Sequence, residues 1–131
     1  LSNKPLTIVG NGKQKRDFIY VTDVVDAFIK SAKSQITNEI FNVGADNPIS
    51  VNRVVELLKC KSSKIPKRPG EPDCTWADIK KIKLMLNWKP KISIEEGISL
   101  LEKNIDYWKK APVWNKTKIN EATKTWFRYL S

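Results

Sequence analysis

Two arginines, Arg16 and Arg68, stand in the settings that best suit ligand chemistry. Arg16 follows a basic, glycine-rich turn, and Arg68 lies in the proline-rigid segment 66–70. A guanidinium group on an ordered backbone binds phosphate through two parallel hydrogen bonds. The two side chains therefore predict a clamp for a diphosphate. The alternative is a pair of surface salt bridges, with Asp17 and Glu71 as the nearby acids.

The residues needed for catalysis are missing from the sequence. It contains no His, which excludes Ser-His-Asp and Cys-His mechanisms. No Tyr is followed four positions later by Lys, so that acid–base pair is also absent. Gly10 and Gly12 begin like a dinucleotide-binding fingerprint, but Lys15 occupies the position of its third glycine. We therefore predict no catalytic, cofactor-binding or metal-binding residue in this chain.

The chain is strongly basic, with 24 Lys and Arg against 14 Asp and Glu and a net charge of +10. Its most basic stretch, 59–68, contains no acid and suits a phosphate-bearing partner, either nucleic acid or a small anion. A basic nucleic-acid-binding module is thus the alternative function from another class. Cys60 and Cys74 match no metal-binding pattern and predict two reduced thiols in a cytoplasmic protein. No stretch is apolar and long enough to span a membrane.

Apolar periodicity predicts an α/β fold for the first sixty residues and a mainly helical second half. Strands are expected at 5–9, 16–21 and 39–44, and helices near 23–32 and 50–58. A Lys- and Pro-rich connection, 59–73, contains no helix because of its prolines. Further helices are expected at 78–86, 94–108 and 119–130, the second of them capped by Ser93.

The same periodicity predicts which side chains are buried. In the first helix, Val25, Phe28, Ile29 and Ala32 share one face. The helix that begins at Ser93 is expected to bury Ile94, Ile98, Leu101, Ile105 and Trp108. Trp76 and Trp88 are expected to anchor the core, and Asp17, Asp23 and Asp78 to hold backbone groups.

Four segments resemble one family in the same order along the chain. Residues 10–25 resemble the segment G-x-G-x-x-x-R-D-F/Y-x-x-V-x-D of extended short-chain dehydrogenases/reductases. Residues 40–44, 68–78 and 86–97 resemble the family's next three segments. The resemblance covers roughly residues 5–110 and is to the nucleotide-sugar epimerases and dehydratases, typified by UDP-glucose 4-epimerase.

The resemblance implies that residues 1–131 are a C-terminal substrate-binding part, with strands and helices at 5–60 and a basic loop plus helices at 61–131. The Rossmann domain, which binds NAD and carries the catalytic Tyr and Lys, is expected to precede it. In the family, residues matching Arg16 and Arg68 contact the diphosphate of the substrate. The residue matching Phe18 lines the same pocket, and the one matching Glu71 reaches the ribose.

The predicted function is therefore the substrate-binding portion of an NAD-dependent nucleotide-sugar epimerase. A 4,6-dehydratase or reductase of the same family is the alternative. The expected partners are a nucleotide sugar, with UDP-sugar favoured, and the protein's own Rossmann domain, and not nucleic acid or a membrane. The whole enzyme is expected to be a cytoplasmic homodimer, and this part alone to be inactive.

Overall fold

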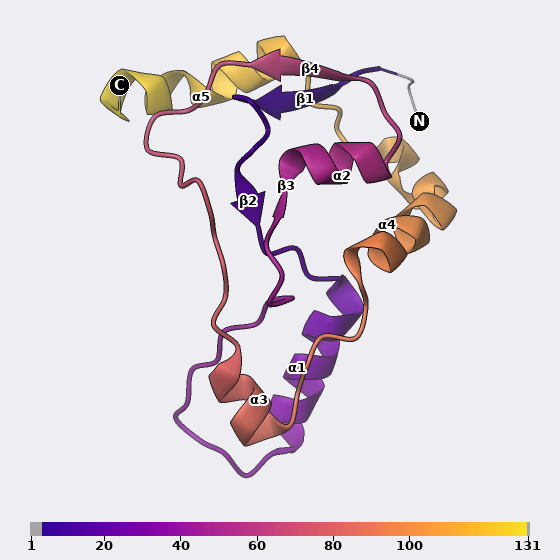
Figure 1. The fold of residues 1–131 in the computed structure, drawn as a ribbon, viewed down its shortest axis with the longest axis vertical. Helices are drawn as coiled ribbons and strands as arrows, with labels where there is room; N and C mark the ends of the chain where they lie inside the picture. Colours follow the sequence, from indigo (N-terminus) through magenta and orange to yellow (C-terminus); the bar gives the residue numbers. More distant parts are fainter. Residues whose placement is uncertain (1–3, 131) are drawn as a thin grey trace.

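The computed structural model describes residues 4–130 and has an elongated shape (Figure 1). The elements in chain order are β1 (Leu6–Val9), β2 (Lys15–Arg16), α1 (Val21–Lys33), β3 (Ile49–Ser50), α2 (Val51–Leu57), β4 (Ser62–Ile65), α3 (Lys80–Leu86), α4 (Ile94–Lys103), the 3-10 helix η1 (Ile105–Lys110) and α5 (Lys116–Leu130). Strands β1 and β4, with α2 and α5, form one end of the molecule, and α1 and α3 form the other (Figure 1). The α/β class is thereby confirmed.

The two small sheets differ in direction. β1 pairs with β4 in parallel, from Leu6 opposite Ser62 to Val9 opposite Ile65. β2 pairs with β3 antiparallel over two residue pairs. A parallel pair needs a crossover connection, and here the chain between β1 and β4 makes the long excursion through α1 and returns through α2.

Two expected strands are wrong, and one strand was not expected. The expected strand at 16–21 is reduced to β2, and its apolar end leads into α1. Segment 39–44 forms no strand; Phe41 and Val43 pack against the core through their side chains instead. Within the predicted connection 59–73, β4 forms because β1 offers it a hydrogen-bonding partner, which composition does not reveal.

The main hydrophobic core lies between α1, α3 and the segment that follows α3. It consists of Ala27, Ile79, Ile82, Leu86 and Trp88. Trp88 is 1% exposed, as predicted, and its indole donates a hydrogen bond to the carbonyl of Asp23. Trp76 is 65% exposed, so its predicted role in the core is wrong; its indole donates to the carboxylate of Asp46.

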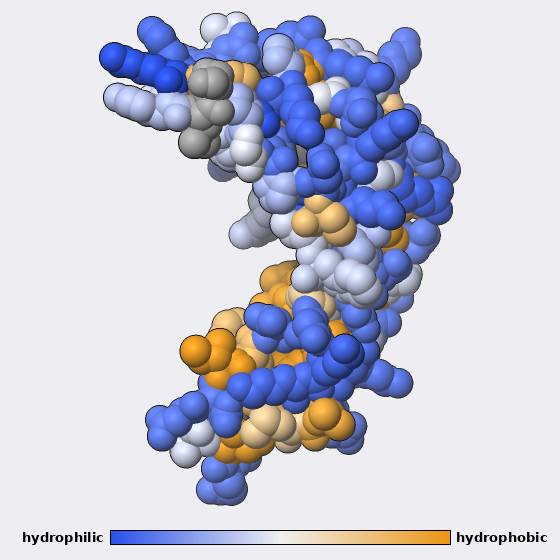
Figure 2. All heavy atoms as spheres, turned by 60° about the vertical axis from the view of Figure 1, so that its left-hand side comes forward, coloured by the Kyte–Doolittle hydropathy of each residue, from blue (hydrophilic) through white to orange (hydrophobic). Residues whose placement is uncertain are grey.

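Helix α1 turns a different face to this core than periodicity predicted. Its buried residues are Asp23 and Ala27. Phe28 is 72% exposed, and Val25, Ile29 and Ala32 are exposed as well. Apolar atoms gather at this end of the molecule in Figure 2, over the elements α1 and α3. The amphipathic pattern correctly predicted the helix, but its apolar face meets no other part of residues 4–130.

The helix after Ser93 is shorter than expected. Ser93 accepts a hydrogen bond from the backbone N–H of Glu96, which confirms the cap, but α4 ends at Lys103 and η1 replaces its last turns. Ile98 is buried as predicted. Leu101, Ile105 and Trp108 are 40–47% exposed, so their predicted burial is wrong. The two cysteines are free and exposed.

Candidate functional site

The glycine-rich turn after β1 is held in place by local hydrogen bonds. Gly10 and Gly12 have positive φ angles of 63° and 74°, which glycine adopts without strain. The side chain of Asn11 accepts a hydrogen bond from the N–H of Lys13 at 2.9 Å, and the Gln14 amide donates to the carbonyl of Val9 at 2.8 Å. These bonds fix the path of the chain from β1 to Arg16.

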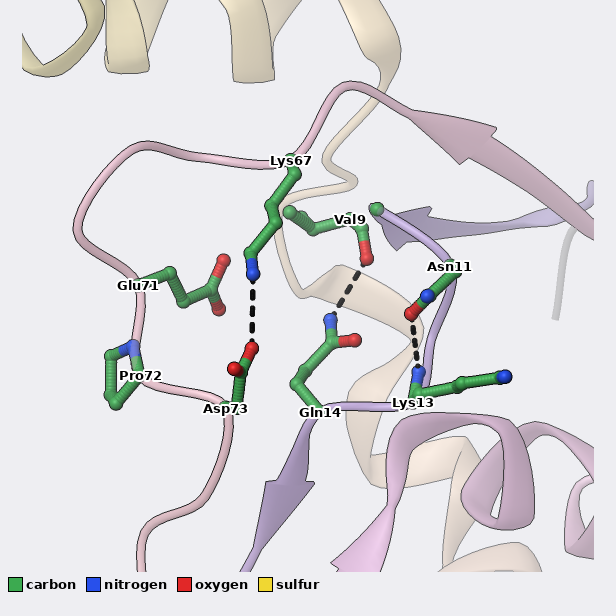
Figure 3. A pocket seen from close by; sticks show the side chains of 9 residues that line it. Val9, Asn11, Lys13, Gln14, Lys67, Glu71, Pro72 and Asp73 are labelled. Carbon is green, nitrogen blue, oxygen red and sulfur yellow. Dashed lines mark hydrogen bonds and ion pairs between the residues drawn. The ribbon is translucent and has the colours of Figure 1, made fainter. Parts of the chain in front are cut away.

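This turn forms one wall of a cavity of about 500 Å³, and the loop after β4 forms the other (Figure 3). The residues lining it are Val9, Gly10, Asn11, Lys13, Gln14, Lys67, Glu71, Pro72 and Asp73. Lys67 and Asp73 form an ion pair at 2.9 Å between residues of the same wall. The cavity thus lies between the first and third of the segments that resemble the family.

Arg16 and Glu71, which are 55 positions apart, form a salt bridge of 3.0 Å beside this cavity. Their side chains are 24% and 16% exposed, so the pair is largely shielded from water. Arg16 also donates to the carbonyl of Pro72 at 3.0 Å. Two of the predicted site residues are therefore in contact, in the salt bridge that was the alternative to phosphate binding.

Arg68 lies elsewhere. Its neighbour Lys67 lines the 500 Å³ cavity, but Arg68 lines two smaller spaces, of about 240 and 330 Å³, against α5. Its guanidinium carbon is 5.6 Å from the ring centre of Trp126. The structure therefore does not place Arg16 and Arg68 on one preformed cavity.

Phe18 is also in a different place from Glu71. It is 39% exposed and lines a separate cavity of about 250 Å³, together with Asn47, Ile49 and the segment 90–95. Between Arg16 and Phe18, the Asp17 carboxylate accepts hydrogen bonds from the backbone N–H groups of Ala45, Asp46, Asn47 and Ala77. The structural role predicted for Asp17 is confirmed, and it fixes the geometry around Phe18.

Sequence reasoning did not identify Gln14, Lys67 and Asp73 as lining residues. Gln14 lies inside the quoted segment 10–25 and Lys67 inside the basic stretch, but neither pattern shows which side chain faces the cavity. Contact between the turn and the loop after β4 depends on the β1–β4 pairing, which the sequence did not predict.

Two exposed carboxyl groups outside the 500 Å³ cavity have shifted pKa values. The hydrogen bond from Lys83 and then that from Trp76 lower the pKa of Asp46 below its ordinary value of 3.8. Backbone hydrogen bonding at the start of α4, followed by the bond from Arg53, lowers the pKa of Glu95. Both groups hold the fold together as carboxylates and suit no proton-transfer role at neutral pH.

The described residues do not form a site for NAD. The turn at Gly10 and Gly12 leads into β2 and not into a helix, whereas dinucleotide pyrophosphate binds at a helix N-terminus. A Cβ at Gly12 would collide with the Asn52 side chain, so packing already explains this glycine. Any cofactor chemistry must therefore be supplied from outside residues 4–130.

A family model described as GDP-mannose 4,6 dehydratase matches residues 1–101. The chain belongs to this family. Its relatives are nucleotide-sugar epimerases and dehydratases of the extended short-chain dehydrogenase/reductase group, which are NAD-dependent. The UDP-glucuronate 4-epimerase of Thermodesulfobacterium geofontis is 40% identical over 123 residues, 88% of this chain and 35% of the relative.

Solved structures agree with this membership. The UDP-glucose 4-epimerase of Thermotoga maritima, solved with UDP-glucose, superposes with a TM-score of 0.74 and 33% identity. The UDP-glucuronic acid 4-epimerase of Bacillus cereus, with UDP-glucuronic acid and NAD, gives 0.74 and 29%. Each match covers 80% of this chain and 36% of the solved chain. The chain thus spans about a third of these relatives. Among residues 4–130, no helix is long and apolar enough to cross a membrane.

Proposed function

We propose that this chain is the substrate-binding portion of an NAD-dependent nucleotide-sugar epimerase, with a 4,6-dehydratase or reductase of the same family as the alternative. The observation that carries the proposal is the cavity of about 500 Å³ between the turn before Arg16 and the loop that bears Glu71. A reductase relative, the dTDP-4-dehydro-6-deoxyglucose reductase of Escherichia coli, is 33% identical and covers 34% of its own length, so family membership alone does not choose the reaction.

In the proposed complex, Arg16 and Arg68 bind the diphosphate of a UDP-sugar. Glu71 accepts hydrogen bonds from the ribose, and Phe18 lines the sugar pocket. The Arg16–Glu71 salt bridge holds both groups near the cavity before the ligand arrives, and its shielding strengthens a charge-assisted bond to phosphate. These residues supply binding energy and orientation, and they leave hydride and proton transfer to groups outside the described chain.

We further propose that the missing groups belong to a Rossmann domain of the same protein. The relatives are about three times as long as this chain. Helix α1 exposes an apolar face, which consists of Val21, Val25, Phe28 and Ile29. An exposed apolar face at helical spacing is typical of a surface that another domain covers. NAD would then be bound by that domain, and the whole enzyme would be a homodimer.

Two further expectations belong to this proposal. Because both cysteines are free and exposed, a reducing compartment such as the cytoplasm suits the protein. The 131-residue chain should show no turnover of UDP-glucose or UDP-glucuronic acid with added NAD, since no acid–base pair or NAD site is found in residues 4–130. Measurable NADH formation or sugar epimerisation by this chain would overturn the division of labour.

Calorimetric titration of UDP into the chain tests the proposed site. Arg16→Ala should weaken binding about 10- to 100-fold, because it removes a charge-assisted contact to phosphate. Arg53→Ala is the matched control, since Arg53 pairs with Glu56 and Glu95 and does not line the 500 Å³ cavity. Equal loss in both variants, or tight salt-dependent binding of an oligonucleotide with no UDP binding, would refute the proposal in favour of nonspecific anion or nucleic-acid binding.

A further inference from the structure

Helix α5 lies outside the residues that the family model matches, which end at 101. Asn115 begins the helix by accepting a hydrogen bond from the N–H of Lys118 at 2.9 Å. The helix runs beside the β1–β4 sheet, at the end of the molecule that carries the proposed substrate cavity (Figure 1). Ile119 and Thr123 of α5 line a space together with Ile65 of β4 and Arg68. The chain thus adds an element against the loop that carries one of the predicted phosphate ligands.

Trp126 connects α5 to that loop through two contacts. Its indole N–H donates a hydrogen bond of 2.7 Å to the carbonyl of Pro69. Its ring lies 5.6 Å from the guanidinium carbon of Arg68, within the range of a cation–π interaction. One side chain of α5 therefore binds both the backbone and the cationic group of the loop.

The position of Arg68 shows which side of the loop α5 favours. Both spaces that Arg68 lines are shared with α5, and Arg68 is absent from the lining of the 500 Å³ cavity. Its Nε is buried and has no hydrogen-bond partner within the described residues. The guanidinium is thus kept beside an aromatic ring with one donor unsatisfied, an arrangement that an anion could improve.

We propose that Trp126 is a positioning residue that holds Arg68 on the α5 side of the loop and competes with the phosphate groups of the nucleotide for it. The inference rests on the proposed function, because it takes Arg68 as a phosphate ligand. Binding of the diphosphate requires the guanidinium to leave the Trp126 ring. The contact therefore lowers the affinity for any phosphate-bearing nucleotide and has no effect on a nucleoside without phosphate.

Calorimetric titration of UDP into the 131-residue chain and its variants tests this competition. Trp126→Leu removes the ring and should tighten UDP binding about 2- to 5-fold, which corresponds to an exposed cation–π contact. Trp126→Phe keeps a ring and should lie closer to the unmodified chain. Tyr129→Leu is the matched control, because it removes an exposed ring of the same helix that stacks on Arg128 and not on Arg68.

Two further measurements separate competition from a general loosening of the loop. In an Arg68→Ala background, Trp126→Leu should no longer alter the affinity for UDP. The indole N–H resonance of Trp126, identified by its absence from the Trp126→Phe spectrum, should shift when UDP is added. Uridine should leave it unchanged.

The outcomes distinguish this inference from the proposed function. If Arg68→Ala weakens UDP binding but Trp126→Leu leaves it unchanged or weakens it, competition is refuted and the proposed phosphate role of Arg68 stands. If Arg68→Ala leaves UDP affinity unchanged, Arg68 is not a phosphate ligand, and both the inference and that part of the proposed function are refuted. An equal gain in Trp126→Leu and Tyr129→Leu would also overturn the inference.

Discussion

Replacing Asp17 by asparagine should destabilise the protein far more than the small change in shape suggests. Each carboxylate oxygen of Asp17 accepts two backbone N–H groups: Oδ1 those of Ala45 and Asn47, and Oδ2 those of Asp46 and Ala77. An asparagine side chain has one accepting oxygen and one donating NH₂ group. In either orientation of the amide, two backbone donors lose their acceptor and face another donor.

The size of the effect follows from the burial of these bonds. The bonds to Ala45 and Ala77 are partly buried, whereas those to Asp46 and Asn47 are exposed and can be replaced by water. Each amide orientation leaves one partly buried donor unsatisfied, and the two remaining bonds lose their charge assistance. The expected loss in the free energy of unfolding is about 2–4 kcal/mol.

Urea unfolding at pH 7, followed by tryptophan fluorescence, measures this loss as a lower midpoint at unchanged slope. Asp78→Asn is the matched control, because Asp78 is exposed and accepts one bond, from the N–H of Lys80 at the start of α3. Asparagine serves as well as aspartate at such a position, so this variant should change stability by less than about 0.5 kcal/mol. If Asp17→Asn costs no more than Asp78→Asn, the accounting of donors and acceptors is refuted.

Three other results are expected. Gly12→Ala should destabilise the chain by more than the roughly 1–3 kcal/mol of backbone strain expected at Gly10→Ala, because only the Gly12 Cβ collides with the Asn52 side chain; equal melting-temperature shifts would contradict this. Because its folded pKa lies below 3.8, Asp46 should add stability above that pH through Lys83 and lose it in more acidic solution; a stability gap between the chain and Asp46→Asn that is constant from pH 7 to pH 3 would count against this. Both free thiols should react with a thiol reagent in the folded chain, and protection of either would disagree with their exposure.

Local sequence patterns predicted the elements whose formation depends on nearby residues. The caps at Ser50 and Ser93 begin α2 and α4 as expected, because a serine side chain accepts a bond from the third residue of its own helix. The prolines of 59–73 excluded a helix there. The four ordered segments identified the family, and with it Arg16 and Glu71, without any knowledge of which residues are in contact.

Only the tertiary structure decided which residues meet, because those contacts join distant parts of the chain. Strand β4 exists because β1 pairs with it, and this pairing brings the loop of Glu71 against the turn before Arg16. The apolar side chains of α1 and the exposed Trp76 follow the composition of a core, yet the core approaches α1 from Ala27 instead. Periodicity shows that a helix has an apolar face, whereas the packing partners of that helix determine what, if anything, covers the face.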